Sequence, residues 1–321
     1  MSQPSQKLLY IAGAGRMGST LMGKILGQAD GFFFGGEMHT LWRNGIVGEV
    51  PCSCHAPIKE CEVWRRILIE AFGSLDAARA ELRPAHVRQY GPTRLPAMMI
   101  GPLRRRFVRS QGKYLDALAR LYHAIFTVTG ARVVVDSSQK ALYGALLETI
   151  PSVELFVVYL LRDPRAYAHS WMKPRQSGDR QEEVRVPGWS QSLGVIGSFW
   201  CLNSLAVERI LERRHVNSMR VRYEDFLARP EHTLREVLAF VGELAARLPL
   251  VDSSTVQLET SHACYGNHSR FRTGAVPLRL DDAWKTDMSP WRRRLVTLMT
   301  WPMMLRYGYS LRASSGTKNP I

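Results

Sequence analysis

Short apolar runs alternate with amphipathic stretches along most of the chain, and this alternation predicts an α/β fold. The run from Lys7 to Ala12 reads as a buried strand, and residues 19–28 place apolar side chains along one side of a helix. The strongest apolar run, Val153 to Leu161, is apolar on both faces, as in a parallel sheet covered on two sides. Strands that alternate with helices in this way predict a doubly wound parallel sheet.

The middle of the chain continues the alternation. Apolar residues recur at helical spacing from Lys113 to Val128, and Gly130 stands where a left-handed residue would end that helix. Arg132 to Val135 is a short β-branched strand that ends at Asp136, and a helix is expected after it. Another helix is expected to begin at Asp163–Pro164, because proline is tolerated in a first turn.

The whole chain of 321 residues is expected to form a single domain. Residues 50–112 combine mixed helical patterns with six prolines and predict a helical insertion. Residues 173–187 are polar and charged and predict a mobile loop, and residues 312–321 predict a disordered tail. A long helix to about Arg214, a strand at Met219 to Val221 and a final helical region are expected to complete the chain.

Composition narrows the class of partner. The chain has 43 Lys and Arg against 28 Asp and Glu, a net charge of +15, which favours an anionic partner such as a nucleotide, a nucleic acid, a sulfated or phosphorylated substrate, or an acidic membrane surface. A hydrophobic content of 45% argues against wholesale disorder. The sequence contains no run of 18 apolar residues, so no membrane span is expected. Five cysteines, an odd number, without an export signal predict a cytoplasmic location.

A glycine loop, G-A-G-R-M-G-S-T at residues 13–20, follows a strand and opens a helix. Such a loop offers backbone N–H groups to an anion. Its glycines fit the dinucleotide pattern G-x-G-x-x-G, and Glu37 lies near the expected position of a ribose-binding acid. ATP hydrolysis is disfavoured, because Ser19 stands where a phosphate-binding lysine is needed.

The same loop, extended as G-A-G-R-M-G-S-T-L-M, resembles the 5′-phosphosulfate loop of sulfotransferases that use 3′-phosphoadenosine 5′-phosphosulfate (PAPS), commonly G-x-x-R-S-G-S-T-L-L. Three later stretches resemble motifs of that family in the right order. L-R-D-P-R-A-Y-A-H-S (161–170) is similar to the 3′-phosphate motif, and V-R-Y-E-D-F-L-A-R-P (221–230) to the Y-E-D segment. G-N-H-S-R-F-R-T-G followed by D-D-A-W-K (266–285) resembles the C-terminal segment of bacterial sulfotransferases.

This resemblance implies a P-loop-like sulfotransferase fold and transfer of a sulfuryl group from PAPS to an acceptor hydroxyl by in-line displacement. Adenosine 3′,5′-bisphosphate would be the second product, and no metal would be required. The residues that the resemblance assigns to the nucleotide are Gly15, Arg16, Gly18, Ser19, Thr20, Arg162, Ser170, Tyr223, Arg270 and Arg272.

The resemblance also implies the catalytic groups. Glu37 is the expected general base, because several sulfotransferase groups place a glutamate just beyond the first βα unit; capping of a nearby helix is its alternative role. His39 is the competing base. Lys140 is a candidate for the sulfuryl oxygens, although Gln139 interrupts the D-S-S-K order of relatives, and Arg16 would replace the P-loop lysine.

Cys52, Cys54, His55 and Cys61 form the pattern C-x-C-H-x5-C, which invites a zinc assignment. The spacing is not a standard C-x2-C pair and no second cluster follows, so no metal is assigned. Structural zinc, a pair of nearby thiols and a disulfide all stay open.

The expected partner is a small-molecule, glycan or lipid acceptor (a sugar, phenol, alcohol or lipid hydroxyl), with no nucleic acid. Arg104–Arg106 and Arg292–Arg294 are typical of a solvated face. The apolar residues 295–305 indicate core or a subunit contact in a homodimer, with a peripheral membrane contact as the alternative. Two rival functions stay open: an NAD(P)-dependent oxidoreductase and a non-catalytic polyanion-binding protein.

Overall fold

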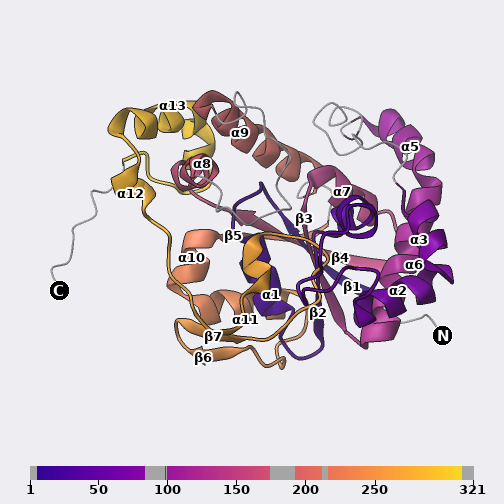
Figure 1. Ribbon diagram of the computed structural model, residues 1–321. Helices are drawn as coiled ribbons and strands as arrows, with labels where there is room; N and C mark the ends of the chain where they lie inside the picture. The colour runs from indigo at the N-terminus through magenta and orange to yellow at the C-terminus, as the bar shows by residue number, and fades with distance from the viewer. Residues whose placement is uncertain (1–5, 84–97, 99, 174–191, 212–215, 313–321) are drawn as a thin grey trace.

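A five-stranded parallel sheet forms the centre of the computed structural model, which describes residues 6–83, 98, 100–173, 192–211 and 216–312 (Figure 1). The strands are β1 (Gln6–Ala12), β2 (Phe32–Gly36), β3 (Val133–Gln139), β4 (Val153–Leu161) and β5 (Asn217–Arg222). Their order is β2-β3-β1-β4-β5, with every neighbouring pair parallel. The predicted α/β fold with a parallel sheet is therefore confirmed.

Helices cover both faces of this sheet (Figure 1). One face carries α1 (Ser19–Leu26), α10 (Tyr223–Ala228) and α11 (Pro230–Phe240), and the other carries α7 (Ala141–Leu147), α8 (Pro164–Met172) and α9 (Leu193–Ile210). The residues of β1 from Leu8 to Ala12 and those of β4 from Val157 to Leu160 are fully buried. Their continuous apolar runs follow from this two-sided covering.

Between β2 and β3 the chain forms a mostly helical segment. Its elements are η1 (Met38–Thr40), η2 (Leu41–Val47), α2 (Glu62–Phe72), α3 (Leu75–Glu81), α5 (Gly101–Ser110) and α6 (Gly112–Thr129). The helix α2 packs on α6, and Gly130 ends α6 in the predicted left-handed conformation. The helices expected in residues 50–112 are thus present where the chain is described.

The expected final helical region is present, but it does not include all of the chain after β5. A three-stranded antiparallel sheet of β6 (Leu250–Asp252), β7 (Thr255–Leu258) and β8 (Gly274–Pro277) precedes α12 (Trp284–Asp287) and α13 (Pro290–Arg306). In β7, Val256 and Leu258 are buried while Gln257 is exposed, a two-residue alternation typical of a strand. Between β7 and β8 lies the short helix η7 (His268–Phe271), next to α1.

The helix α13 is only partly core. Val296 and Met304 are fully buried against the molecule, whereas Leu298 and Trp301 are exposed. Among the described residues, no helix combines the length and the apolar character that crossing a bilayer would need. The predicted mobile loop after Lys173 and the tail after Arg312 lie outside the described residues.

Candidate active site

A cavity of about 710 Å³ opens at the carboxyl ends of β1, β3 and β4, within the range of small-ligand pockets. This is the edge at which ligands bind in open α/β sheets. Among the sequence-predicted residues, those that line it are Gly15, Arg16, Gly18, Ser19, Thr20, Glu37, Lys140, Arg162, Ser170, Tyr223 and Arg272. The described lining residues do not include His39 or Arg270.

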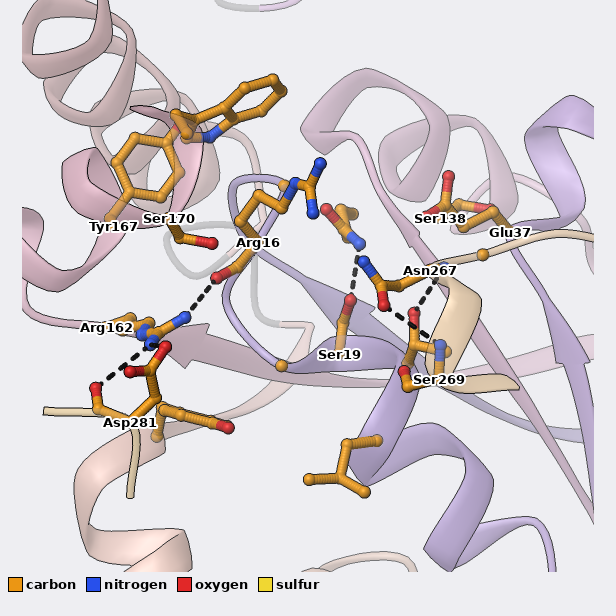
Figure 2. A pocket seen from close by; sticks show the side chains of 18 of the residues that line it. Arg16, Ser19, Glu37, Ser138, Arg162, Tyr167, Ser170, Asn267, Ser269 and Asp281 are labelled. Atoms are coloured by element: carbon orange, nitrogen blue, oxygen red, sulfur yellow. Dashed lines mark hydrogen bonds and ion pairs between the residues drawn. The ribbon is translucent and has the colours of Figure 1, made fainter. Parts of the chain in front are cut away.

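The arrangement of these residues is two-ended (Figure 2). Arg162, Ser170 and Asp281 lie at one end of the cavity, Glu37 and Ser138 lie at the other, and Arg16 lies between them with Ser19 below it. Glu37 and Arg162, at opposite ends, are more than 100 residues apart in the chain, and the neighbouring strands β3, β1 and β4 bring the two ends to one edge of the sheet. An elongated ligand with charged groups along its length fits such a cavity.

The glycine loop between β1 and α1 forms the floor. Gly18 caps α1 with a φ of 90°, and Arg16 has a φ of 69°, a left-handed conformation that is costly for a residue with a side chain. No described side chain caps α1, and the first N–H groups of a helix have no partner inside it. The loop therefore presents backbone donors and the positive end of a helix dipole to the cavity.

Side chains from distant segments fix the first turn of α1. Ser19 Oγ accepts a hydrogen bond from Gln139 Nε2, and Thr20 Oγ1 accepts one from the backbone N–H of Asn267 at 3.2 Å. Buried Lys24 donates through Nζ to the carbonyl oxygens of Arg270, at 2.8 Å, and Arg272. These contacts tie the loop to β3 on one side and to the η7 segment on the other.

A bulge explains the extra residue before Lys140. Along β1, Tyr10 pairs with Asp136 and Ala12 with Gln139, so three steps of β3 match two of β1. Gln139 absorbs the mismatch with a φ of 66°, and both Gln139 and Lys140 line the cavity. The interruption of the D-S-S-K order therefore does not remove Lys140 from the site.

Arg162 is buried directly after β4 and contacts Arg16, Asp281 and Tyr223. Its Nη1 donates to the carbonyl oxygen of Arg16 at 3.0 Å, its Nη2 lies 3.6 Å from Asp281 Oδ2, and its guanidinium carbon lies 4.8 Å from the ring centre of Tyr223. Lys173 pairs with the same carboxylate at 3.1 Å. Although burial opposes ionisation of Asp281, Lys173 and Arg162 hold its pKa below the usual value.

Glu37 and His39 are placed differently. Glu37 lies at the start of η1, donates its backbone N–H to Tyr265 O at 3.0 Å, and makes no side-chain capping bond to η1, so the capping alternative is not supported. The backbone N–H of His39 donates to Ser138 Oγ at 3.0 Å, and His39 is not among the described lining residues. Burial, with a smaller contribution from Lys140, lowers the pKa of His39 to about 3, which makes it a weak base.

Arg270 and Arg272 also differ in their position relative to the cavity. Arg272 lines the cavity, whereas Arg270 is 1% exposed and donates to the carbonyl oxygens of Gly266 at 2.6 Å and Pro51 at 3.5 Å. The Arg270 guanidinium carbon also lies 4.2 Å from the ring centre of Phe271. Of the two arginines predicted to hold phosphate, Arg270 instead supports the segment from behind.

Several lining residues escaped the sequence analysis. Trp171 follows Ser170 directly, and its ring centre lies 5.6 Å from the Arg16 guanidinium carbon. Asn267 and Ser269 lie inside the quoted C-terminal motif and were not singled out. Trp171 could have been found by extending the predicted helix one residue past Ser170. Asn267 and Ser269 could have been found because they are polar residues two positions apart in that motif.

Sheet order argues against the dinucleotide hypothesis. In a dinucleotide-binding sheet the second strand lies beside the first, which brings its acidic residue to the ribose. Here β3 separates β2 from β1, so Glu37 is two strands away from the glycine loop's own strand. The G-x-G-x-x-G match is therefore not accompanied by the strand order of a dinucleotide-binding sheet.

A solved structure shares the fold of this chain. None of the curated proteins compared with the chain matches it. Among solved structures, it is similar to the sulfotransferase domain from the curacin biosynthetic pathway, with a TM-score of 0.51 and 15% identity over 97% of this chain and 100% of that one. A sulfotransferase from Alicyclobacillus acidocaldarius gives a TM-score of 0.42 and 13% identity over 97% and 98%.

The sequence itself matches the profile of the sulfotransferase family over residues 9–244. That stretch includes the glycine loop, Glu37, Lys140, Arg162 and Tyr223, and it covers more than half of the chain. The chain therefore belongs to the sulfotransferase family.

Proposed function

We propose that this sulfotransferase uses PAPS as its donor, transfers the sulfuryl group to an acceptor hydroxyl, and releases adenosine 3′,5′-bisphosphate. The observation that supports the proposal most is the two-ended cavity, with the glycine loop at its centre and Arg162 and Ser170 at one end (Figure 2). A nucleotide with phosphates at both its 5′ and 3′ positions would use both features.

The 5′-phosphosulfate would lie on the glycine loop. Backbone N–H groups at the start of α1, the Ser19 and Thr20 hydroxyls and Arg16 supply donors there, and the helix dipole favours an anion. Arg162, Ser170 and Arg272 would hold the 3′-phosphate, since guanidinium groups bind phosphate oxygens in pairs.

The reaction needs a base for the acceptor and positive charge near the leaving group. The acceptor oxygen would attack sulfur while its proton passes to the Glu37 carboxylate, and the S–O bond to the 5′-phosphate would break with its electron pair going to that phosphate. Arg16 and Lys140, both lining the cavity, would stabilise the charge on the leaving phosphate and the sulfuryl oxygens.

Glu37 and Lys140 are supported as a pair by the topology. Glu37 follows β2 and Lys140 follows β3, and these strands are neighbours in the sheet. A base and a cation at adjacent strand ends can act on the two sides of one transferred group. The acceptor belongs to the class of hydroxyl compounds: sugars, phenols, alcohols or lipids.

The proposal is tested by binding and transfer measured together. Thermal-shift and calorimetric titrations would compare adenosine 3′,5′-bisphosphate with NADP⁺, and labelled PAPS would be offered to panels of the four acceptor classes. We expect stabilisation by the bisphosphate and label in at least one class of acceptor. Stabilisation by NADP⁺ alone would overturn the donor assignment, and salt-dependent RNA or DNA binding without transfer would support the polyanion-binding alternative instead.

A further inference from the structure

Three cysteines and a histidine meet at one point outside the cavity. Cys52 and Cys54 come from the turn before α2, Cys61 directly precedes α2, and His262 comes from the segment after β7, some 200 residues later in the chain. Their ligand atoms all lie within 4.8 Å of one another. The proposed sulfuryl transfer uses none of these residues.

The distances suit a tetrahedral ion. His262 Nδ1 lies 3.3 Å from Cys61 Sγ and 3.9 Å from Cys52 Sγ. Around a tetrahedral zinc ion with Zn–S bonds of about 2.3 Å and Zn–N bonds of about 2.0 Å, the distance between a sulfur and a nitrogen ligand is about 3.5 Å. The two measured values lie on either side of this length, so small side-chain movements would complete the site.

His55, the histidine inside the C-x-C-H-x5-C pattern, is not part of the cluster. It is exposed, adopts a φ of 72°, and its ring stacks on Phe271 with 4.7 Å between ring centres. The sequence pattern therefore contains three members of the cluster. The fourth, His262, comes from the C-terminal segment, which no local spacing rule could identify.

Hydrogen bonds fix the backbone around the cluster. Ser53 N–H donates to Ala263 O at 3.1 Å, and Ser53 Oγ accepts from Ala263 N–H at 2.7 Å. Trp64 Nε1 donates to the carbonyl oxygen of His262 at 2.6 Å, which fixes the backbone of that ligand. Cys52 and Cys61 are buried, while Cys54 and His262 are half-buried and leave a route for an ion to enter.

We infer that Cys52, Cys54, Cys61 and His262 form a structural zinc site. Three thiolates and an imidazole are the donor set of a closed Cys₃His centre, in which the protein supplies all four ligands and no position is left for substrate. Binding would release the thiol protons to solvent, because cysteine coordinates as the thiolate. The assignment is independent of the proposed donor and acceptor.

The site would stabilise the wall of the cavity. Two residues after His262, the backbone N–H of Cys264 donates to Gly35 O at 2.9 Å, and Tyr265 O accepts from Glu37 N–H. The same segment then contributes Asn267 and Arg272 to the cavity. A zinc ion that joins α2 to His262 would fix the register of this segment against β2, next to Glu37.

Metal content tests the inference directly. The full chain, produced without a histidine tag and passed through a metal-free column, should carry about one zinc ion per molecule by plasma mass spectrometry. After removal of zinc by chelation under reducing conditions, added Co²⁺ should produce the visible absorption bands of a tetrahedral thiolate site, which Zn²⁺ itself does not show, and added zinc should restore the melting temperature. A chain that neither carries zinc nor shows these cobalt bands would overturn the inference.

Matched variants separate the ligands from their neighbours. Cys54→Ser and His262→Ala should lose most of the zinc, whereas Cys201→Ser and His55→Ala should keep it. Equal zinc content in all four variants would overturn the inference, as would a disulfide between cluster cysteines in the freshly purified, alkylated protein. Because His262→Ala could unfold the chain, the chelation and cobalt measurements on the unaltered protein provide the independent test.

Discussion

Arg162 and Asp281 form an ion pair, with 3.6 Å between Nη2 and Oδ2, at the end of the cavity where we place the 3′-phosphate. Asp281 comes from the segment before α12 and is 42% exposed, whereas Arg162 is almost entirely buried. Among the described residues that line this end of the cavity, Arg162 is the only positively charged residue that is buried. The Asp281 carboxylate occupies one side of its guanidinium group. A bound phosphate would compete with Asp281 for Arg162.

This competition predicts that Asp281→Asn binds adenosine 3′,5′-bisphosphate more tightly. The variant removes a negative charge beside the phosphate and frees Arg162, a gain of about fivefold for a pair worth about 1 kcal/mol. Isothermal titration calorimetry measures the change. Asp282→Asn is the matched control, because Asp282 pairs with Lys285 at 3.1 Å and is not among the described lining residues. Weaker binding by Asp281→Asn than by the control would contradict this role.

Gly18 is expected to tolerate no side chain. A Cβ atom there would lie 2.2 Å from Tyr223 Cε2, and the φ of 90° is strained for any other residue. We expect Gly18→Ala to lose several kcal/mol of stability and most nucleotide affinity, from overpacking and strain together. Thermal melts and titrations would measure both. Gly112→Ala should be neutral, since no described atom lies within 4 Å of its Cβ position; similar losses in the two variants would refute the argument.

Glu37→Gln tests the general base. The substitution keeps the shape of the side chain but cannot accept the acceptor's proton, so turnover should fall by about 10²–10⁴-fold. Affinity for adenosine 3′,5′-bisphosphate should stay within about twofold, because the nucleotide is held elsewhere. Glu70→Gln, on the exposed side of α2, is the control. Turnover like that of the control would remove Glu37 from the mechanism.

Asp136 predicts a pH dependence of stability. It accepts hydrogen bonds from Ser138 and Tyr122, yet burial raises its pKa from 3.8 to about 6. The folded chain then holds this proton more tightly than the unfolded chain, so the free energy of unfolding falls as pH rises from about 4 to about 6, by up to about 3 kcal/mol.

Denaturant titrations at several pH values would measure this change. The stability of the unaltered chain relative to Asp136→Asn should decrease across that window, whereas its stability relative to Asp116→Asn, an exposed position, should stay constant. A flat difference for Asp136→Asn would show that this carboxyl titrates normally.

Sequence patterning predicted the central strands β1, β3 and β4 because they are buried on both faces, and continuous apolar runs are typical of such strands. The run Val153–Leu161 became β4 with the same limits, and the glycine loop lies where a strand meets a helix. The small sheet of β6, β7 and β8 was missed, because each strand has only three or four residues and the turn at Asp252 resembles a loop. Strands this short contain too few alternating apolar and polar positions to be recognised from sequence.

The order of the sequence motifs predicted most of the residues that line the cavity. It could not show which of two nearby residues in one motif lines the cavity. His39 and Arg270 stand two residues from Glu37 and Arg272, and only the tertiary structure shows that they are not among the described lining residues. The bulge at Gln139 and the meeting of Cys61 with His262 depend on tertiary structure in the same way. Local spacing does not contain these relationships.

The central claim is that one nucleotide binds with its 5′-phosphosulfate on the glycine loop and its 3′-phosphate at Arg162. Calorimetric titration of the unaltered chain, Arg162→Ala and the exposed control Arg229→Ala with adenosine 3′,5′-bisphosphate and with adenosine 5′-phosphate tests it most directly. We expect Arg162→Ala to lose about 10–100-fold in affinity for the bisphosphate, as for a charged hydrogen-bond partner worth about 1.5–3 kcal/mol, and almost none for the monophosphate. Equal losses for both ligands, or none for either, would contradict the claim.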